Sequence, residues 1–231
     1  MRLRWLDLLR SAAIVAMVFY HAAYDLDVLY GWDLNVNRGA WKVFQVCVAS
    51  LFLVVSGISA GFWTRSENRY ERGWRRGWQI LSAAMCVSLV TALIDPGTWV
   101  RFGILHLIGV SAFLLPIVRP LRPIPIAVLG IACILLGYVA AGYDATTNVF
   151  IPLGFIPPYF RSVDFVPVFP WMGPVLLGFA VGVPLSMRPA TISARPRMGT
   201  LGDLLVWPGK HSLLIYLVHQ PMILGVLWIG S

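Results

Sequence analysis

Four ionisable residues share one face of the first apolar segment of the chain: Asp7, Arg10, His21 and Asp25. Arg10 and His21 are separated by about three helical turns, and Asp7 and Asp25 each lie about one turn beyond one of them. Ionisable groups inside a membrane span are costly, and they usually face a protein interior or a wet cavity in which they function. This ionic stripe is therefore a first indication of an enzyme.

The residue types of the stripe suit group transfer. His21 can act as a general base or a transient acyl acceptor, because imidazole takes up a proton near neutral pH. Asp25 is placed to orient that ring and stabilise its cation. Arg10 can bind a phosphate or a carbonyl oxygen of a donor, and Asp7 would hold Arg10 in position. The alternatives are that Arg10 only extends to the cytoplasmic interface and that Asp25 lies in an outer loop.

The composition indicates a membrane protein. Hydrophobic residues make up 58% of the 231 positions and charged residues only 12%, a balance too apolar for a soluble domain. The net charge of +8 does not indicate a nucleic-acid partner, because the basic residues form short clusters between apolar runs. The three cysteines lie inside apolar runs without metal-ligand spacing, so we expect no metal. No cleavage site follows the basic start, which predicts that the first helix stays as an anchor.

Apolar runs of membrane-spanning length predict an all-α, polytopic membrane helical bundle of about seven transmembrane helices. The sixth run contains Pro170, Pro174 and Pro184, which predict a kinked or partly re-entrant helix. Without internal repeats or a long linker, residues 1–231 are expected to form one transmembrane domain. The predicted spans are about residues 8–24, 42–63, 76–94, 102–118, 124–142, 168–187 and 211–229.

Basic residues predict the orientation of these spans, because they concentrate in cytoplasmic segments. The second connection holds a cluster between Arg65 and Arg76, and the intervening connections hold few Lys or Arg residues. The amino terminus is therefore expected inside and the carboxyl terminus outside, with His21 about 16 Å outward from Arg10. The other residues that carry this bias are Arg2, Arg4, Arg119, Arg122, Arg188, Arg195, Arg197 and Lys210.

Further polar residues lie near helix ends or within spans. His106 starts the fourth helix on the side of His21, where it is a second acid/base group, an acceptor-binding residue or a hydrogen-bonded helix-end histidine. Ser212, Tyr216 and His219 share a face of the last helix. They line a donor channel, hold His21, or form interhelical hydrogen bonds without a role in catalysis.

Two patterns in the second span and its connection have simpler explanations. Gly57 and Gly61, four residues apart, predict a face for close helix packing. The basic cluster that runs from Arg65 to Arg76 is a topology determinant that can also attract acidic lipids or the phosphates of coenzyme A.

Several of these residues stand in segments that resemble a known family, the bacterial proteins related to the catalytic domain of heparan-α-glucosaminide N-acetyltransferase. The opening Leu-Asp-Leu-Leu-Arg with the later Tyr20-His21 carries the likeness, although Ser11 stands where the family usually has glycine. The spacing from Arg10 to His21 is also similar to that of membrane acyltransferases that modify cell-surface glycans. The other matching segments are 102–109, 169–178 and 209–221.

The resemblance implies an acetyl transfer from cytoplasmic acetyl-CoA to an amino sugar or glycan hydroxyl outside, in a bacterial inner membrane. The candidate catalytic residues are then His21, Asp25 and His106, and the candidate donor-binding residues are Asp7, Arg10, Tyr216 and His219. Membrane lipids surround such a protein, and a homo-oligomer is left open. Two other functions also stay open: a transporter or flippase for a lipid-linked sugar, and a haem or quinone protein that uses His21 with His106 or His219.

Overall fold

The computed structural model describes residues 4–187 and 199–229. Nearly all of the apolar segments in this part of the chain are helical. The chain divides into two compact units, Met1–Phe52 with Pro189–Ser231, and Leu53–Arg188. Of the residues used to predict orientation, Arg2, Arg188, Arg195 and Arg197 lie outside the described part. That residues 1–231 act as one domain stays a prediction.

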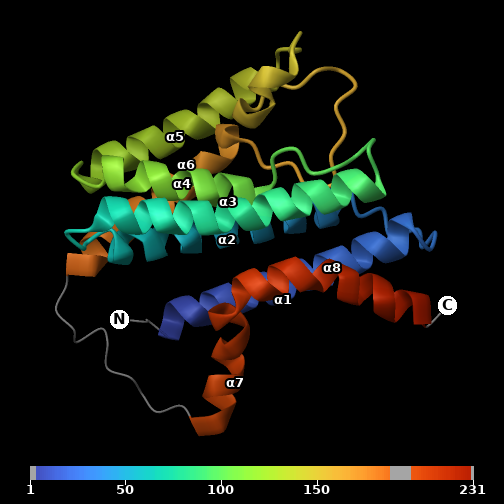
Figure 1. Ribbon diagram of the computed structural model, residues 1–231, viewed down its shortest axis with the longest axis horizontal. Coiled ribbons are helices and arrows are strands. Elements are labelled where there is room, and N and C mark those ends of the chain that lie inside the picture. The colour runs from blue at the N-terminus through green and yellow to red at the C-terminus, as the bar shows by residue number, and fades with distance from the viewer. Residues whose placement is uncertain (1–3, 188–198, 230–231) are drawn as a thin grey trace. The chain divides into compact units, whose positions relative to one another are not determined.

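The helices follow the predicted spans, which confirms the polytopic helical bundle (Figure 1). Within the described residues, six helices are long and apolar enough to cross a membrane, and α4 is a shorter apolar helix. The elements are α1 (Arg4–Val28), α2 (Gly39–Trp63), α3 (Arg69–Ile94), α4 (Ile104–Val118), α5 (Pro123–Ala140), the 3-10 helix η1 (Asn148–Leu153), α6 (Val168–Met187), α7 (Gly199–Lys210) and α8 (Ser212–Ile229).

Helix α7 is an addition to the prediction, which treated residues 188–210 as a connection. Its 12 residues include Asp203, Pro208 and Lys210, so it has neither the length nor the apolar run by which a span is recognised. Arg4 at the start of α1 forms an ion pair with Asp203, Nη2 to Oδ1 3.4 Å. The helix is thus attached to α1.

In the first unit, α1 packs against both α7 and α8, and Figure 1 shows α1 and α8 side by side. The two run in the same direction, because early residues of α1 contact the end of α7, whereas His21 contacts His219 and Asp25 contacts Gln220. Two helices that cross a membrane in the same direction are separated by an odd number of crossings. Helices α2 to α6 supply an odd number only if the short α4 also crosses, which supports seven crossings.

In the second unit, glycines allow α2 and α6 to approach backbone to backbone. A Cβ at Gly61 would collide with the backbone of Gly182, and one at Gly178 would collide with the carbonyl of Val54. Small residues at such interfaces permit the close van der Waals packing that drives helix association in lipid. The predicted packing face of Gly57 and Gly61 is confirmed, since Gly57 lies equally close to the carbonyl of Val175.

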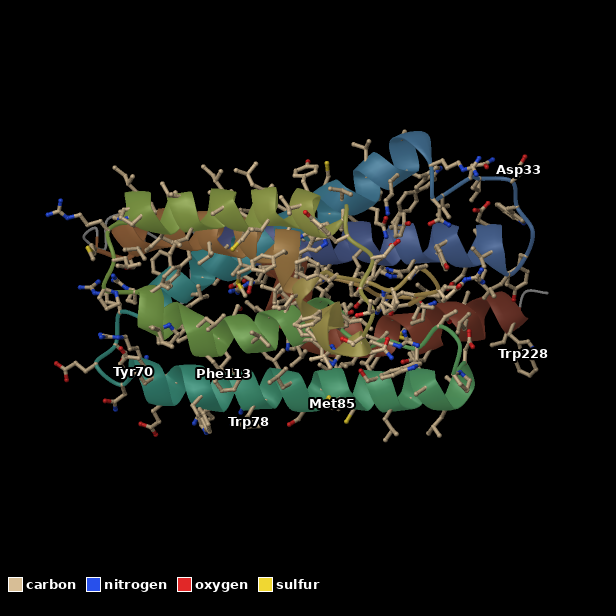
Figure 2. The ribbon with its side chains drawn as sticks, turned by 90° about the horizontal axis from the view of Figure 1, so that it is seen from above. Asp33, Tyr70, Trp78, Met85, Phe113 and Trp228 are labelled. Atoms are coloured by element: carbon tan, nitrogen blue, oxygen red, sulfur yellow. The ribbon has the colours of Figure 1, made fainter. Side chains whose placement is uncertain are left out.

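Helices α3 and α4 pack antiparallel in the same unit. Gly73 lies against Pro116, and Gly77 lies against the ring of Phe113. The ring of Trp78 meets that of Phe113 at 5.9 Å between centroids, in the region where Figure 2 labels both residues. This register places the first turn of α3 beside the end of α4.

Helix α6 is interrupted near its start, as its prolines predict. Phe169 has an extended backbone (φ −102°, ψ 123°) within the helix. A residue that precedes a proline is biased away from helical geometry, and here that proline is Pro170. The predicted kink is therefore confirmed.

Candidate active site

The ionic stripe of α1 faces α7 and α8. At its first end, the Asp7 carboxylate accepts a hydrogen bond from Arg10, with 2.9 Å between Nη1 and Oδ1, as the spacing of the two residues predicts. Asp7 is only 3% exposed. The Ser11 hydroxyl accepts a hydrogen bond of 2.8 Å from the backbone N–H of Gly209, and a Cβ at Gly209 would collide with the Asp7 carbonyl. The end of α7 is thereby docked on α1 beside the Asp7–Arg10 pair.

Further along the stripe, two histidines meet. The rings of His21 on α1 and His219 on α8 lie edge to face, with 4.9 Å between their centroids. Nδ1 of His21 lies 2.9 Å from the carbonyl oxygen of Met17, and Nδ1 of His219 lies 2.7 Å from that of Tyr216. A carbonyl oxygen can only accept, so both Nδ1 atoms carry the proton. In the neutral rings, both Nε2 atoms therefore carry a lone pair.

The short distance between the two rings also bears on the haem alternative. With metal–nitrogen bonds of about 2 Å on each side, two axial imidazoles would have centroids about 6 Å apart. The 4.9 Å between His21 and His219 leaves no room for an iron between them. The pair is thus unsuited to bis-histidine ligation.

Asp25 lies one turn beyond His21 and inside α1, not in an outer loop. Its carboxylate is 2% exposed and accepts two hydrogen bonds from the side-chain amide of Gln220, of 2.9 Å to Oδ1 and 2.8 Å to Oδ2. The sequence-based expectation was that Asp25 orients the ring of His21. In the structure the Met17 carbonyl orients that ring, and Asp25 is directed to α8, where the amide donor lies.

Three buried polar atoms near His21 have no hydrogen-bond partner in the described part of the chain: Tyr20 Oη, His219 Nε2 and Gln220 Oε1. The Tyr20 ring lies 5.8 Å from that of His21, and Gln220 follows His219 on α8. Unpartnered buried polar atoms are rare in native proteins, and a cluster of them indicates a polar ligand or water. Two of these three atoms are acceptors, and the tyrosine hydroxyl both donates and accepts, so the cluster suits a ligand rich in N–H or O–H groups.

Tyr216 acts on His219 in two ways. Its carbonyl oxygen holds the Nδ1 proton of His219, and its ring lies 5.6 Å from the imidazole between centroids. The sequence placed Tyr216 and His219 on one face, where holding His21 was one alternative beside lining a donor channel and interhelical hydrogen bonding. The contact between His219 and His21 favours that alternative.

His106 lies at the start of α4, in the second unit, and both of its ring nitrogens are engaged. Nδ1 accepts from the backbone N–H of Gly103 at 3.2 Å, and Nε2 lies 3.3 Å from the Ser88 hydroxyl. That hydroxyl donates to the Val100 carbonyl at 2.6 Å, so Nε2 is the donor toward Ser88. This arrangement favours the helix-end interpretation of His106 over proton transfer, and a meeting of His106 with His21 stays a prediction.

Ser11, Gly209 and Gln220 contribute contacts that sequence reasoning did not assign. Ser11 lies four positions after Asp7 and so on the same face of α1 as the ionic stripe. Gln220 follows His219 as a second polar residue in an apolar helix. Each signal was visible, but the partner of each residue lies about two hundred positions away along the chain.

Comparison with known families gives one match over nearly the entire chain. The family model described as "Heparan-alpha-glucosaminide N-acetyltransferase, catalytic" matches residues 2–221. The match includes every residue of the ionic stripe and the α8 residues Tyr216, His219 and Gln220. Comparisons with curated proteins and with solved structures gave no match.

Proposed function

We propose that this chain, which belongs to the heparan-α-glucosaminide N-acetyltransferase catalytic family, transfers acetyl groups across a membrane with His21 at the reacting centre. The donor is acetyl-CoA on the cytoplasmic side. The acceptor is an amino sugar or a glycan hydroxyl on the outer side of a bacterial inner membrane. The observation that carries this proposal is the pairing of His21 and His219, with each Nδ1 held by a backbone carbonyl.

The fixed Nδ1 proton presents Nε2 of His21 as the base. In a direct transfer, the acceptor amine or hydroxyl attacks the thioester carbonyl carbon and the carbon–sulfur bond breaks. Nε2 takes the acceptor proton and passes it to the departing thiolate. In a two-step transfer, Nε2 itself attacks the carbonyl carbon, and the carbon–sulfur bond breaks as the thiolate leaves. The acceptor then displaces the acetyl group from the ring, and the released Nε2 takes the acceptor proton and passes it to the thiolate.

Both routes place positive charge on His21, and Asp25 stabilises that charge. The Asp25 carboxylate interacts electrostatically with His21, and the Gln220 amide holds it in place. The carboxylate stays acceptor-only while it is ionised. It acts on the reaction through its charge and the imidazole remains the group that moves the proton.

The unpartnered atoms around His21 form the proposed acceptor site. His219 Nε2 and Gln220 Oε1 accept hydrogen bonds, and the Tyr20 hydroxyl can donate or accept. An amino sugar offers several N–H and O–H donors and therefore satisfies these atoms. His219 thus belongs to acceptor binding in this proposal, in place of the donor role that the sequence first suggested.

Arg10 and Asp7 form the proposed donor end of the stripe. Arg10 lies about 16 Å from His21 along the helix axis, and Asp7 fixes its guanidinium. An arginine so positioned can bind a phosphate or carbonyl oxygen of coenzyme A. The stripe then guides the donor from the cytoplasmic end of α1 toward His21.

The test measures coenzyme A release from acetyl-CoA by purified protein in detergent, with glucosamine as acceptor. His21→Ala is expected to lower the rate at least about 100-fold, the usual contribution of a positioned acid/base group. His211→Ala is a matched control, because Nδ1 of His211 also bonds a backbone carbonyl, that of Trp207, but the residue is exposed. A rate that survives in His21→Ala contradicts the proposal.

The pH profile gives a second test. Protonation at Nε2 removes the lone pair that the reaction needs. The rate is therefore expected to fall about tenfold per pH unit once the medium is acidic enough to protonate His21. A rate that does not fall on acidification contradicts the role of His21 as the base.

A further inference from the structure

Three arginines gather at one end of the second unit. Arg65 follows the last turn of α2, Arg69 opens α3, and Arg119 follows the last residue of α4. The antiparallel register of α3 and α4 brings Arg69 and Arg119 to the same end. Figure 2 labels Tyr70, the residue that follows Arg69 in the sequence, at this end of α3. Arg65 joins them and donates from Nη1 to the Ser186 carbonyl at the end of α6, at 2.7 Å.

The three positive charges are close enough to act on one another. Burial, followed by the charges of Arg69 and Arg65, holds the pKa of Arg119 below its ordinary value. Such an arrangement is unfavourable unless an anion offsets the repulsion.

The protein does not supply that anion in its described part. Neither Arg65, Arg69 nor Arg119 forms an ion pair with an acidic side chain among residues 4–187 and 199–229. The nearby Glu67 and Glu71 are exposed. The segment 188–198, which follows Ser186 in the sequence, contains no Asp or Glu.

Two of the guanidinium groups also have unused donors. The Nε atoms of Arg69 and Arg119 are buried and have no hydrogen-bond partner in the described residues. An arginine that binds a phosphate side-on uses Nε–H together with one Nη–H, in a bidentate contact. The unused donors are therefore of the type that a phosphate group takes.

We propose that Arg65, Arg69 and Arg119 form a binding site for a phosphate group. The phosphate belongs either to an anionic lipid headgroup or to a soluble phosphate ester such as coenzyme A. Setting the orientation of the helices in the membrane does not require Arg65, Arg69 and Arg119. The neighbouring residues Arg72, Arg75 and Arg76 on α3 are exposed and already supply the positive charge for that purpose. The site does not depend on the proposed acetyl transfer, and His21→Ala is expected to retain it.

The test compares Arg119→Gln with Arg75→Gln, an exposed arginine of α3 that changes the net charge equally. Binding of coenzyme A and of 3′-dephospho-coenzyme A is measured by titration calorimetry. Binding of phosphatidylglycerol, against phosphatidylcholine, is measured by native mass spectrometry. We expect Arg119→Gln to weaken binding about tenfold, equal to about 1.4 kcal/mol, and Arg75→Gln to leave it unchanged.

The probes distinguish the source of the phosphate. A loss with coenzyme A that is absent with the dephospho form assigns the 3′-phosphate to the cluster, and an equal loss with both assigns the pyrophosphate. A loss confined to phosphatidylglycerol assigns a lipid headgroup. If Arg75→Gln weakens binding as much as Arg119→Gln, or if neither does, the proposal is overturned.

Folding of the variant provides its own control. Arg119→Gln removes one of three charges that repel, so its Tm without added phosphate is expected to equal or exceed that of the unsubstituted protein. Should this variant fail to fold, Arg69→Gln tests the same site from α3. Since His21→Ala leaves the cluster intact, binding and acetyl transfer can fail independently.

Discussion

The contact between Gln220 and Asp25 allows a prediction with a defined magnitude. Gln220→Leu keeps the approximate volume of the side chain and removes both hydrogen bonds to a carboxylate that is 2% exposed. Hydrogen bonds to a charged group contribute about 1.5–3 kcal/mol each. A buried carboxylate without donors can take up a proton instead of staying charged, which limits the loss. We therefore expect a loss of about 3 kcal/mol in the free energy of unfolding.

For a chain of this length that loss corresponds to a Tm lowered by about 6–12 °C. The measurement is the fraction of monodisperse protein that remains in detergent after heating. Gln79→Leu is the matched control, because Gln79 is an exposed glutamine of α3, and its Tm is expected to change by less than about 2 °C.

A double variant separates the buried charge from the packing. Replacing both partners of a buried hydrogen bond by apolar groups can be nearly neutral, so Asp25→Leu with Gln220→Leu is expected to lose less than Gln220→Leu alone. Two results would refute the reasoning. One is a Gln220→Leu variant with the same Tm as Gln79→Leu. The other is a double variant whose loss of stability equals the sum of the losses of Asp25→Leu alone and Gln220→Leu alone.

Three further predictions concern the packing around the stripe and in the second unit. His106→Ala leaves the Gly103 N–H without its acceptor, so Tm is expected to fall by about 2–12 °C. The coenzyme A release rate per folded molecule is expected to stay unchanged, and a rate lowered about 100-fold would instead assign His106 to the chemistry. Gly57→Ala forces a Cβ into a carbonyl of α6 and is expected to cost about 1–3 kcal/mol, whereas Gly225→Ala, which meets nothing within 4 Å, is expected to be neutral in the same thermal assay. Ser11→Ala removes the acceptor of the Gly209 N–H and is expected to cost about 1–3 kcal/mol, and an unchanged Tm would show that α7 is not held there.

Much of the fold could be predicted because its signals are local. A span is recognised from the apolar length of its own segment, and Pro170 or the pair Gly57 and Gly61 indicate a kink or a packing face without knowledge of any partner. Helix α7 was missed because its polar residues and 12-residue length give no such signal. The ionic stripe was predicted from helical periodicity alone.

The sequence by itself determined which residues of α1 share a face and that Asp7 would meet Arg10, because residues three and four positions apart are neighbours on any α-helix. Only the tertiary structure decided what the other residues of that face contact. Asp25 has other polar residues nearby on its own helix, yet the group that donates hydrogen bonds to it is the amide of Gln220 on α8. The ring that faces His21 is likewise on α8, that of His219. These partners depend on the parallel packing of α1 and α8, which no local pattern encodes. The orientation of His21 by the Met17 carbonyl follows from the same cause, since the carboxylate that could have held the ring is directed to α8.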